Sequence, residues 1–100
     1  MTMTIQSSGD RYFDVIEAKG YQVIVLGEIG EQWTDEVLSL FEREDVDIVF
    51  FPWSKSVDLR LQLETVYYPF IQLWRDGSLK AEFTGYHNEE IKTTIIEQIK

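Results

Sequence analysis

The sequence contains no cysteine. This absence excludes disulfide bonds, thiolate metal sites and every mechanism that uses a thiol nucleophile. A single histidine, His87, leaves no second imidazole for a metal site. Neither a glycine-rich phosphate loop nor a nucleophile elbow occurs. The sequence therefore predicts no catalytic residues, no metal and no cofactor, and we do not expect an enzyme.

Positive charge is also scarce, with 9 Lys and Arg against 18 Asp and Glu and a formal net charge of −9. Such a balance argues against direct binding to nucleic acid or to an anionic membrane, because both favour clustered cations. No apolar run has the length of a membrane span, and the first residues lack the pattern of a signal peptide. We expect a cytoplasmic protein whose partners are neutral or basic where they touch it.

The chain has 100 residues, of which 44% are hydrophobic and 14% aromatic. This composition predicts one globular domain over residues 1–100. Hydrophobic periodicity predicts helices at residues 11–19, 33–44 and from 88 onward. It predicts strands at residues 3–7, 21–26, 47–51, 70–74 and 79–84, the last two joined by an Asp-Gly hairpin turn. Alternating strands and helices imply a mixed central sheet with helices on both faces.

Three local features carry further expectations. Residues 57–64 alternate apolar and polar side chains, which favours a strand, yet they are good helix formers. The second helix places Trp33 at the start of an apolar stripe, so we expect this ring mainly in the core, with Gln32 or Thr34 near the helix start. Asn88 is expected to cap the last helix, and His87 to be a loop or cap residue.

From Tyr68 to Leu79 the sequence reads Tyr-Pro-Phe-Ile-Gln-Leu-Trp-Arg-Asp-Gly-Ser-Leu, and Gly85 follows. This stretch resembles the cis-proline, apolar strand, turn and edge strand of the thioredoxin family. The resemblance covers nearly the whole chain. It implies the order β-α-β-α-β-α-β-β-α, makes residues 57–67 the short helix and loop before the proline, and implies a cis bond between Tyr68 and Pro69.

The chain departs from the family at the positions that carry thiol chemistry. Gly30 and Trp33 stand where the two catalytic cysteines would stand. Ile24 occupies the position of a buried acid, and Phe50 the position of a nearby lysine. Without a sulfur nucleophile, thiol–disulfide exchange has no chemical basis in this chain. We therefore expect a redox-inactive member of the family.

In the family, the groove beside the cis-proline accepts an extended segment of a partner protein. The resemblance thus implies a protein-binding adaptor or accessory subunit whose partner is another protein. Two alternatives stay open: a glutathione-binding or transferase-like domain, and a purely structural subunit. A virus-encoded accessory protein would fit the small size and the acidic charge. The expected binding residues are Gly30, Glu31, Gln32, Trp33, Tyr67, Tyr68, Pro69, Gly85 and Tyr86.

Overall fold

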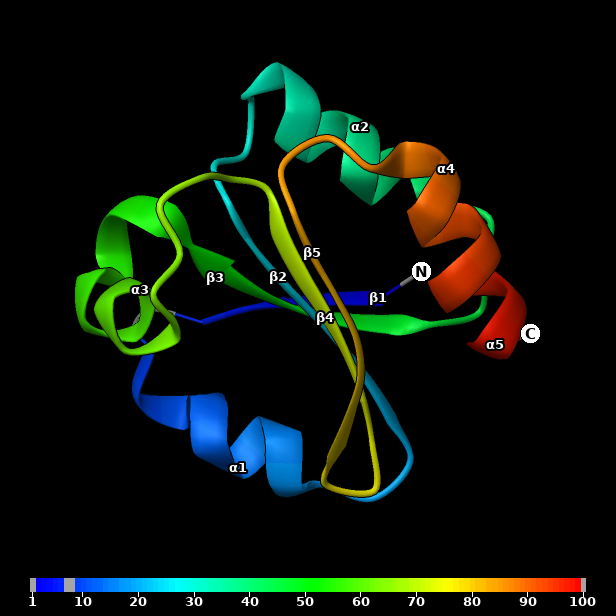
Figure 1. Ribbon diagram of the computed structural model, residues 1–100, viewed down its shortest axis with the longest axis horizontal. Coiled ribbons are helices and arrows are strands. Elements are labelled where there is room, and N and C mark those ends of the chain that lie inside the picture. Colours follow the sequence, from blue (N-terminus) through cyan, green and yellow to red (C-terminus); the bar gives the residue numbers. More distant parts are fainter. Residues whose placement is uncertain (1, 7–8, 100) are drawn as a thin grey trace.

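A five-stranded mixed sheet forms the centre of the computed structural model, which describes residues 2–6 and 9–99 (Figure 1). The strand order is β1-β3-β2-β4-β5. β1 and β2 both pair in parallel with β3, whereas β4 runs antiparallel to β2 and β5 antiparallel to β4. The strands are β1 (Thr2–Ile5), β2 (Tyr21–Gly27), β3 (Asp47–Pro52), β4 (Phe70–Arg75) and β5 (Ser78–Thr84). Residue 7, the predicted end of the first strand, lies outside the described residues.

Helices cover both faces of this sheet (Figure 1). One face packs against η1 (Gly9–Arg11), α1 (Tyr12–Glu17) and α3 (Val57–Leu63), and the other against α2 (Gln32–Leu40), α4 (Asn88–Ile91), the π-helical η3 (Lys92–Ile96) and α5 (Glu97–Ile99). A short 3-10 turn, η2 (Trp53–Lys55), follows β3. The predicted fold class, a mixed sheet flanked by helices on both faces, is confirmed.

Each face of the sheet has its own buried core because neighbouring strand residues point to opposite faces. The core between the sheet and helices α1 and α3 consists of Tyr12, Ile24, Leu26, Phe51, Leu59 and Phe70. Beneath the other helices lie Val23, Val25, Val37, Phe41, Ile48, Phe50, Ile71, Leu73, Ile91, Ile95 and Ile96. Every apolar position of β2 after Gln22 is fully buried, as the continuous run predicted for a central strand.

Residues 57–63 form helix α3 despite their alternating pattern. Of the alternating apolar side chains, Leu59 is buried, whereas Val57 is 48% and Leu61 72% exposed. The alternation of apolar and polar residues in this segment therefore does not mark one buried face of a strand. The helix ends at Glu64, which takes the left-handed conformation that closes many helices.

The buried stripe of α2 consists of Thr34, Val37 and Phe41, so the expectation that Trp33 is mainly core is wrong. Its ring is 48% exposed at the first turn of α2, where it contacts the exposed ring of Tyr86 rather than the buried core. The helix ends at Leu40 rather than at residue 44.

The last helix differs from its prediction at two places. His87, not Asn88, occupies the cap position, and the Oδ1 atom of Asn88 is buried without a hydrogen-bond partner. The π-helical segment interrupts the helix at a run of β-branched residues, and the Thr93 hydroxyl donates to the carbonyl of Glu89 at 3.1 Å. Such hydroxyls compete for helix carbonyls, which favours an irregular turn.

Candidate functional site: an aromatic surface at one end of the sheet

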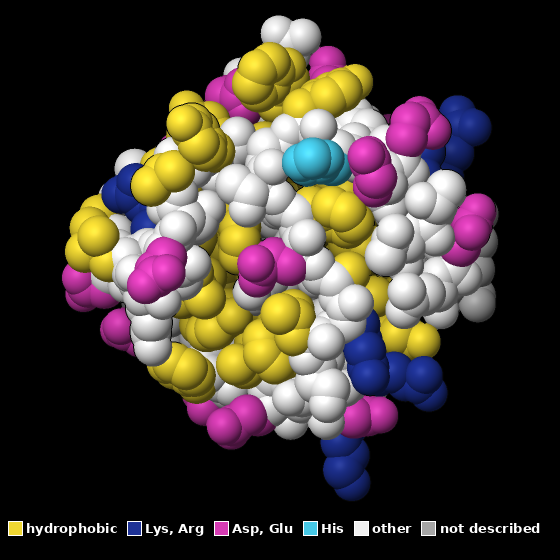
Figure 2. Space-filling view, in the orientation of Figure 1, with side chains coloured by type: hydrophobic (Ala, Val, Ile, Leu, Met, Phe, Trp, Pro, Cys, Tyr) yellow, Lys and Arg dark blue, Asp and Glu magenta, His cyan; other side chains and the backbone are white. Residues whose placement is uncertain are grey.

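The register of the sheet brings three loops to the same end. Leu26 pairs with Phe70, Gly27 with Pro52, and Phe70 with Thr84. The loops after β2, before β4 and after β5 therefore lie side by side, at the top of Figure 1. Hydrophobic side chains gather over these loops in Figure 2. We call the exposed or half-buried rings of Trp33, Tyr67, Tyr68 and Tyr86 the aromatic surface.

The loop after β2 is fixed by hydrogen bonds to its own helix and to η2. The N–H of Glu28 donates to the Thr34 hydroxyl at 3.3 Å, and the N–H of Gly30 donates to Asp35 Oδ1 at 3.0 Å. The carboxylate of Glu28 accepts from the N–H of Ser54 at 2.6 Å. Gly30 has a φ of +94°, a left-handed value that favours glycine. These hydrogen bonds tie the loop to α2 and to η2.

Glu31 begins α2 and supplies its N-cap. Its Oε1 accepts from the N–H of Trp33 at 3.1 Å, and its Oε2 accepts from the N–H of Thr34 at 3.0 Å. Burial alone would raise the pKa of Glu31, but these two bonds and a third from the Thr34 hydroxyl hold the pKa below its ordinary value. Glu31 therefore positions Trp33 rather than presenting a free carboxylate.

The structure brings the first and last predicted segments of the site together. The ring centroids of Trp33 and Tyr86 are 6.1 Å apart. Gly85, with a φ of +86°, donates its N–H to the carbonyl of Pro69 at 2.9 Å. The loop after β5 is thereby anchored to the residue just before β4, and it carries Tyr86, which is 56% exposed.

Tyr68 lies between this anchored loop and a tryptophan that the sequence prediction did not include in the site. Its ring packs edge-on against Trp53, with centroids 5.1 Å apart, and the Tyr68–Pro69 peptide bond is cis. Tyr67 is 69% exposed, and its carbonyl accepts from the Thr65 hydroxyl at 3.3 Å. Within residues 2–6 and 9–99, neither the backbone N–H nor the carbonyl of Tyr68 makes a hydrogen bond.

Two predicted positions differ in detail from the expected arrangement. Gln32 donates to Glu36 at 3.3 Å along the surface of α2, and within the described chain its side chain makes no hydrogen bond to the other predicted residues. Phe50 lies in the core opposite to that of Ile24. Phe50 is therefore not on the same face of the sheet as Ile24, whose register partner is the apolar Val49.

The signal that could have identified Trp53 is its place directly after Pro52, at the end of a buried strand. Because parallel strands of one sheet end at the same edge, a residue following β3 lies near the residues following β2. The bond from Ser54 to Glu28 is the direct evidence of that proximity.

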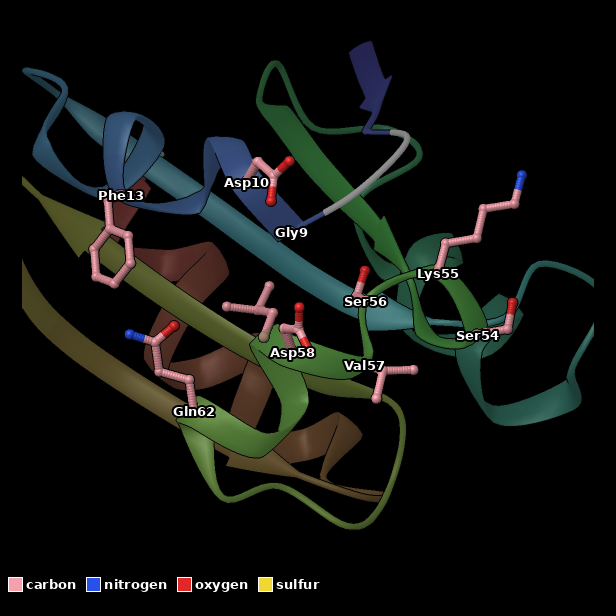
Figure 3. Close-up of a pocket in the computed structure, with 10 residues that line it drawn as sticks. Gly9, Asp10, Phe13, Ser54, Lys55, Ser56, Val57, Asp58 and Gln62 are labelled. Atoms are coloured by element: carbon pink, nitrogen blue, oxygen red, sulfur yellow. The ribbon is translucent and has the colours of Figure 1, made fainter.

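Cavities lie on several sides of the molecule. One of about 300 Å³ separates η1 and Phe13 from α3 and is lined by Ser54 to Leu59 and Gln62 (Figure 3). Another of about 240 Å³ lies along α2, and a third of about 280 Å³ lies beside Trp53. No group of three or more metal-ligating side chains occurs in the described part of the chain. Among the same residues, no helix has the length and hydrophobicity needed to cross a lipid bilayer.

No protein-family model and no curated protein sequence matches the chain. Solved structures do match over nearly its full length. Thioredoxin from Trypanosoma brucei brucei has a TM-score of 0.80 at 9% identity, covering 98% of this chain and 91% of that one. Thioredoxin from Schistosoma mansoni has a TM-score of 0.76 at 12% identity, covering 96% and 94%. Mitochondrial thioredoxin 3 from Saccharomyces cerevisiae has a TM-score of 0.75 at 17% identity, covering 95% and 94%.

These likenesses establish that the chain has a thioredoxin-like fold. The positions that resemble the family's two cysteines hold glycine and tryptophan, and the chain contains no cysteine anywhere. The fold is therefore that of a thioredoxin, without the sulfur atoms on which thiol–disulfide exchange depends.

Proposed function

We propose that this chain is a redox-inactive thioredoxin-like protein that binds an extended segment of another protein across its aromatic surface. It would act as an adaptor or as an accessory subunit of an assembly. The observation that carries the proposal is the backbone of Tyr68, whose N–H and carbonyl have no hydrogen-bond partner within the described residues. An extended peptide can satisfy such a donor and acceptor by main-chain hydrogen bonds.

The surroundings of Tyr68 support this proposal. Tyr and Trp are the side chains that most often anchor protein interfaces. Here Trp33 is 48%, Tyr67 69% and Tyr86 56% exposed, although each could bury much of its ring against a partner. The bonds to Glu31, Asp35 and Pro69 fix the loops that carry Trp33 and Tyr86. Fixed loops lose little conformational freedom on binding, which favours affinity.

The test is a selection from a phage-displayed library of random twelve-residue peptides on the immobilised chain, followed by affinity measurement of single peptides. We expect Tyr68→Ala or Trp33→Ala to weaken binding by about fivefold or more, since an aromatic anchor contributes about 1 kcal/mol or more.

Phe13→Ala is the matched control, because Phe13 is 50% exposed on α1, away from the aromatic surface. This control should leave the affinity unchanged. If the peptides bind the Tyr68→Ala and Trp33→Ala variants as tightly as they bind the unaltered chain, the partner uses another surface.

A further inference from the structure

A pocket of about 280 Å³ lies next to the aromatic surface, on the side of α3. Trp53 belongs to both, since its ring packs against Tyr68 and also forms a wall of the pocket. Three of the pocket's side chains are aliphatic and exposed, at 48% for Val57, 72% for Leu61 and 74% for Val66. The lining residues are Trp53, Val57, Arg60, Leu61, Thr65 and Val66.

Arg60 is the charged group of this pocket. Its guanidinium carbon lies 4.6 Å from the centroid of the Trp53 ring, so the cation stacks on the aromatic face. Its Nε atom is buried and has no hydrogen-bond partner. No carboxylate within residues 2–6 and 9–99 forms a salt bridge with it, in a chain with 18 acidic residues. The other polar side chain of the lining, Thr65, donates to the carbonyl of Tyr67.

A buried donor without an acceptor is uncommon, because it loses its bonds to water and gains none. The two terminal Nη groups of a guanidinium also lie side by side, in a spacing that matches the two oxygens of a carboxylate. The aliphatic walls match methylene groups. The volume is just below the roughly 300–1,000 Å³ of small-molecule sites, which suits one side chain.

We propose that the Trp53–Arg60 pocket binds an acidic side chain, preferably glutamate, of the same partner segment that crosses the aromatic surface. The carboxylate accepts hydrogen bonds from Arg60, and the methylene groups pack against Val57, Leu61 and Val66. This inference rests on the proposed function and adds the chemistry of one partner residue. It also places the acidic residue of the segment beside Trp53, on the α3 side of Tyr68.

The first test compares peptides selected on the unaltered chain with their glutamate-to-glutamine versions. We expect an acidic residue to recur at one position of the selected peptides. Changing this residue to glutamine should weaken the affinity of the peptide for the unaltered chain by about fivefold or more. The same change should leave the affinity for the Arg60→Met variant unaltered, because methionine keeps the packing but lacks the hydrogen-bond donors. Arg60→Glu should select a basic residue at that position instead. Lys55→Met is the matched control, because Lys55 is a nearby exposed cation outside the pocket lining.

Two outcomes separate the two proposals. Selected peptides that depend on Tyr68 but show neither acidic enrichment nor sensitivity to Arg60→Met would overturn the pocket and leave the proposed function intact. If no selected peptide depends on Tyr68 or Trp33, the proposed function fails.

The pocket can also be tested without any partner. N-acetyl-glutamate amide is titrated while the NMR signals of the Trp53 indole and the Arg60 Nε–H are followed. Both signals should shift more than with the glutamine analogue. Equal shifts for the two analogues would overturn the pocket.

Discussion

Gln72 is a buried polar residue that joins helix α1 to the hairpin of β4 and β5. It lies in β4, is 2% exposed, and uses both atoms of its amide. Its Oε1 accepts from the Tyr12 hydroxyl at 2.6 Å and from the Trp74 indole at 2.9 Å, while its Nε2 donates to Glu82 at 2.7 Å. Burial raises the pKa of Tyr12, which keeps the hydroxyl protonated and able to donate.

This network predicts the effect of exchanging the amide for a carboxylate. Gln72→Glu keeps both acceptor bonds but places a second negative charge against Glu82. A buried charge without a partner is strongly destabilising, so we expect a loss of about 3 kcal/mol in the free energy of unfolding at pH 7. Urea unfolding followed by tryptophan fluorescence measures the change.

The double variant Gln72→Glu with Glu82→Gln is the control for this prediction. It restores an amide donor facing the new carboxylate, and it should recover most of the lost stability. A double variant that is no more stable than Gln72→Glu alone would mean that the repulsion with Glu82 is not the cause.

At the scale of elements, α2 depends on Glu31 for its first turn. Glu31→Ala leaves the N–H groups of Trp33 and Thr34 without their acceptor. Loss of an N-cap costs about 1 kcal/mol. We therefore expect the free energy of unfolding of Glu31→Ala at pH 7 to be lower by this amount, as measured by urea unfolding. Glu42→Ala, at an exposed acid just after the helix, should change stability little.

The pH dependence of the Glu31 contribution has a defined sign. The folded-state pKa of Glu31 lies below its ordinary value of 4.5, so the stabilisation is present above that value. It is lost as the pH falls through the folded-state pKa. The difference in free energy of unfolding between the unaltered chain and Glu31→Ala should therefore become smaller in acid. A difference that is the same at pH 7 and at pH 3 would contradict the role of the ionised carboxylate.

Most elements could be predicted from the sequence because their hydrophobic periods are those of buried faces. The run of β2 is buried throughout, and the Asp76-Gly77 turn has positive φ at both residues, as a tight hairpin requires. The helix at residues 57–63 could not be predicted from its period alone, because Val57 and Leu61 are exposed. The π-helical segment depends on a local competition between Thr93 and the backbone, which periodicity does not record.

At the scale of the whole molecule, the candidate site was only partly visible in the sequence. Trp33 and Tyr86 are 53 positions apart in the sequence, and their contact follows from the register of three strands. The family resemblance supplied that register. The cap formed by Glu31 and the stacking of Arg60 on Trp53 depend on side-chain geometry. No spacing in the sequence indicates either contact.

The position of β1 has a consequence for the behaviour of the chain in concentrated solution. Ile48, Val49, Phe50 and Phe51 form an uncharged, strongly apolar stretch of β3, and β1 covers its outer side. β1 itself is a poor template for aggregation, since it has four residues, two of them threonine. Removal of residues 1–5 would turn β3 into a sheet edge with unpaired backbone groups and a high β-propensity. We expect the shortened chain to scatter light and bind thioflavin T within hours at concentrations at which the full chain stays clear. A shortened chain that remains monomeric would show that β1 is not needed as a shield, and that β3 resists self-association by other means.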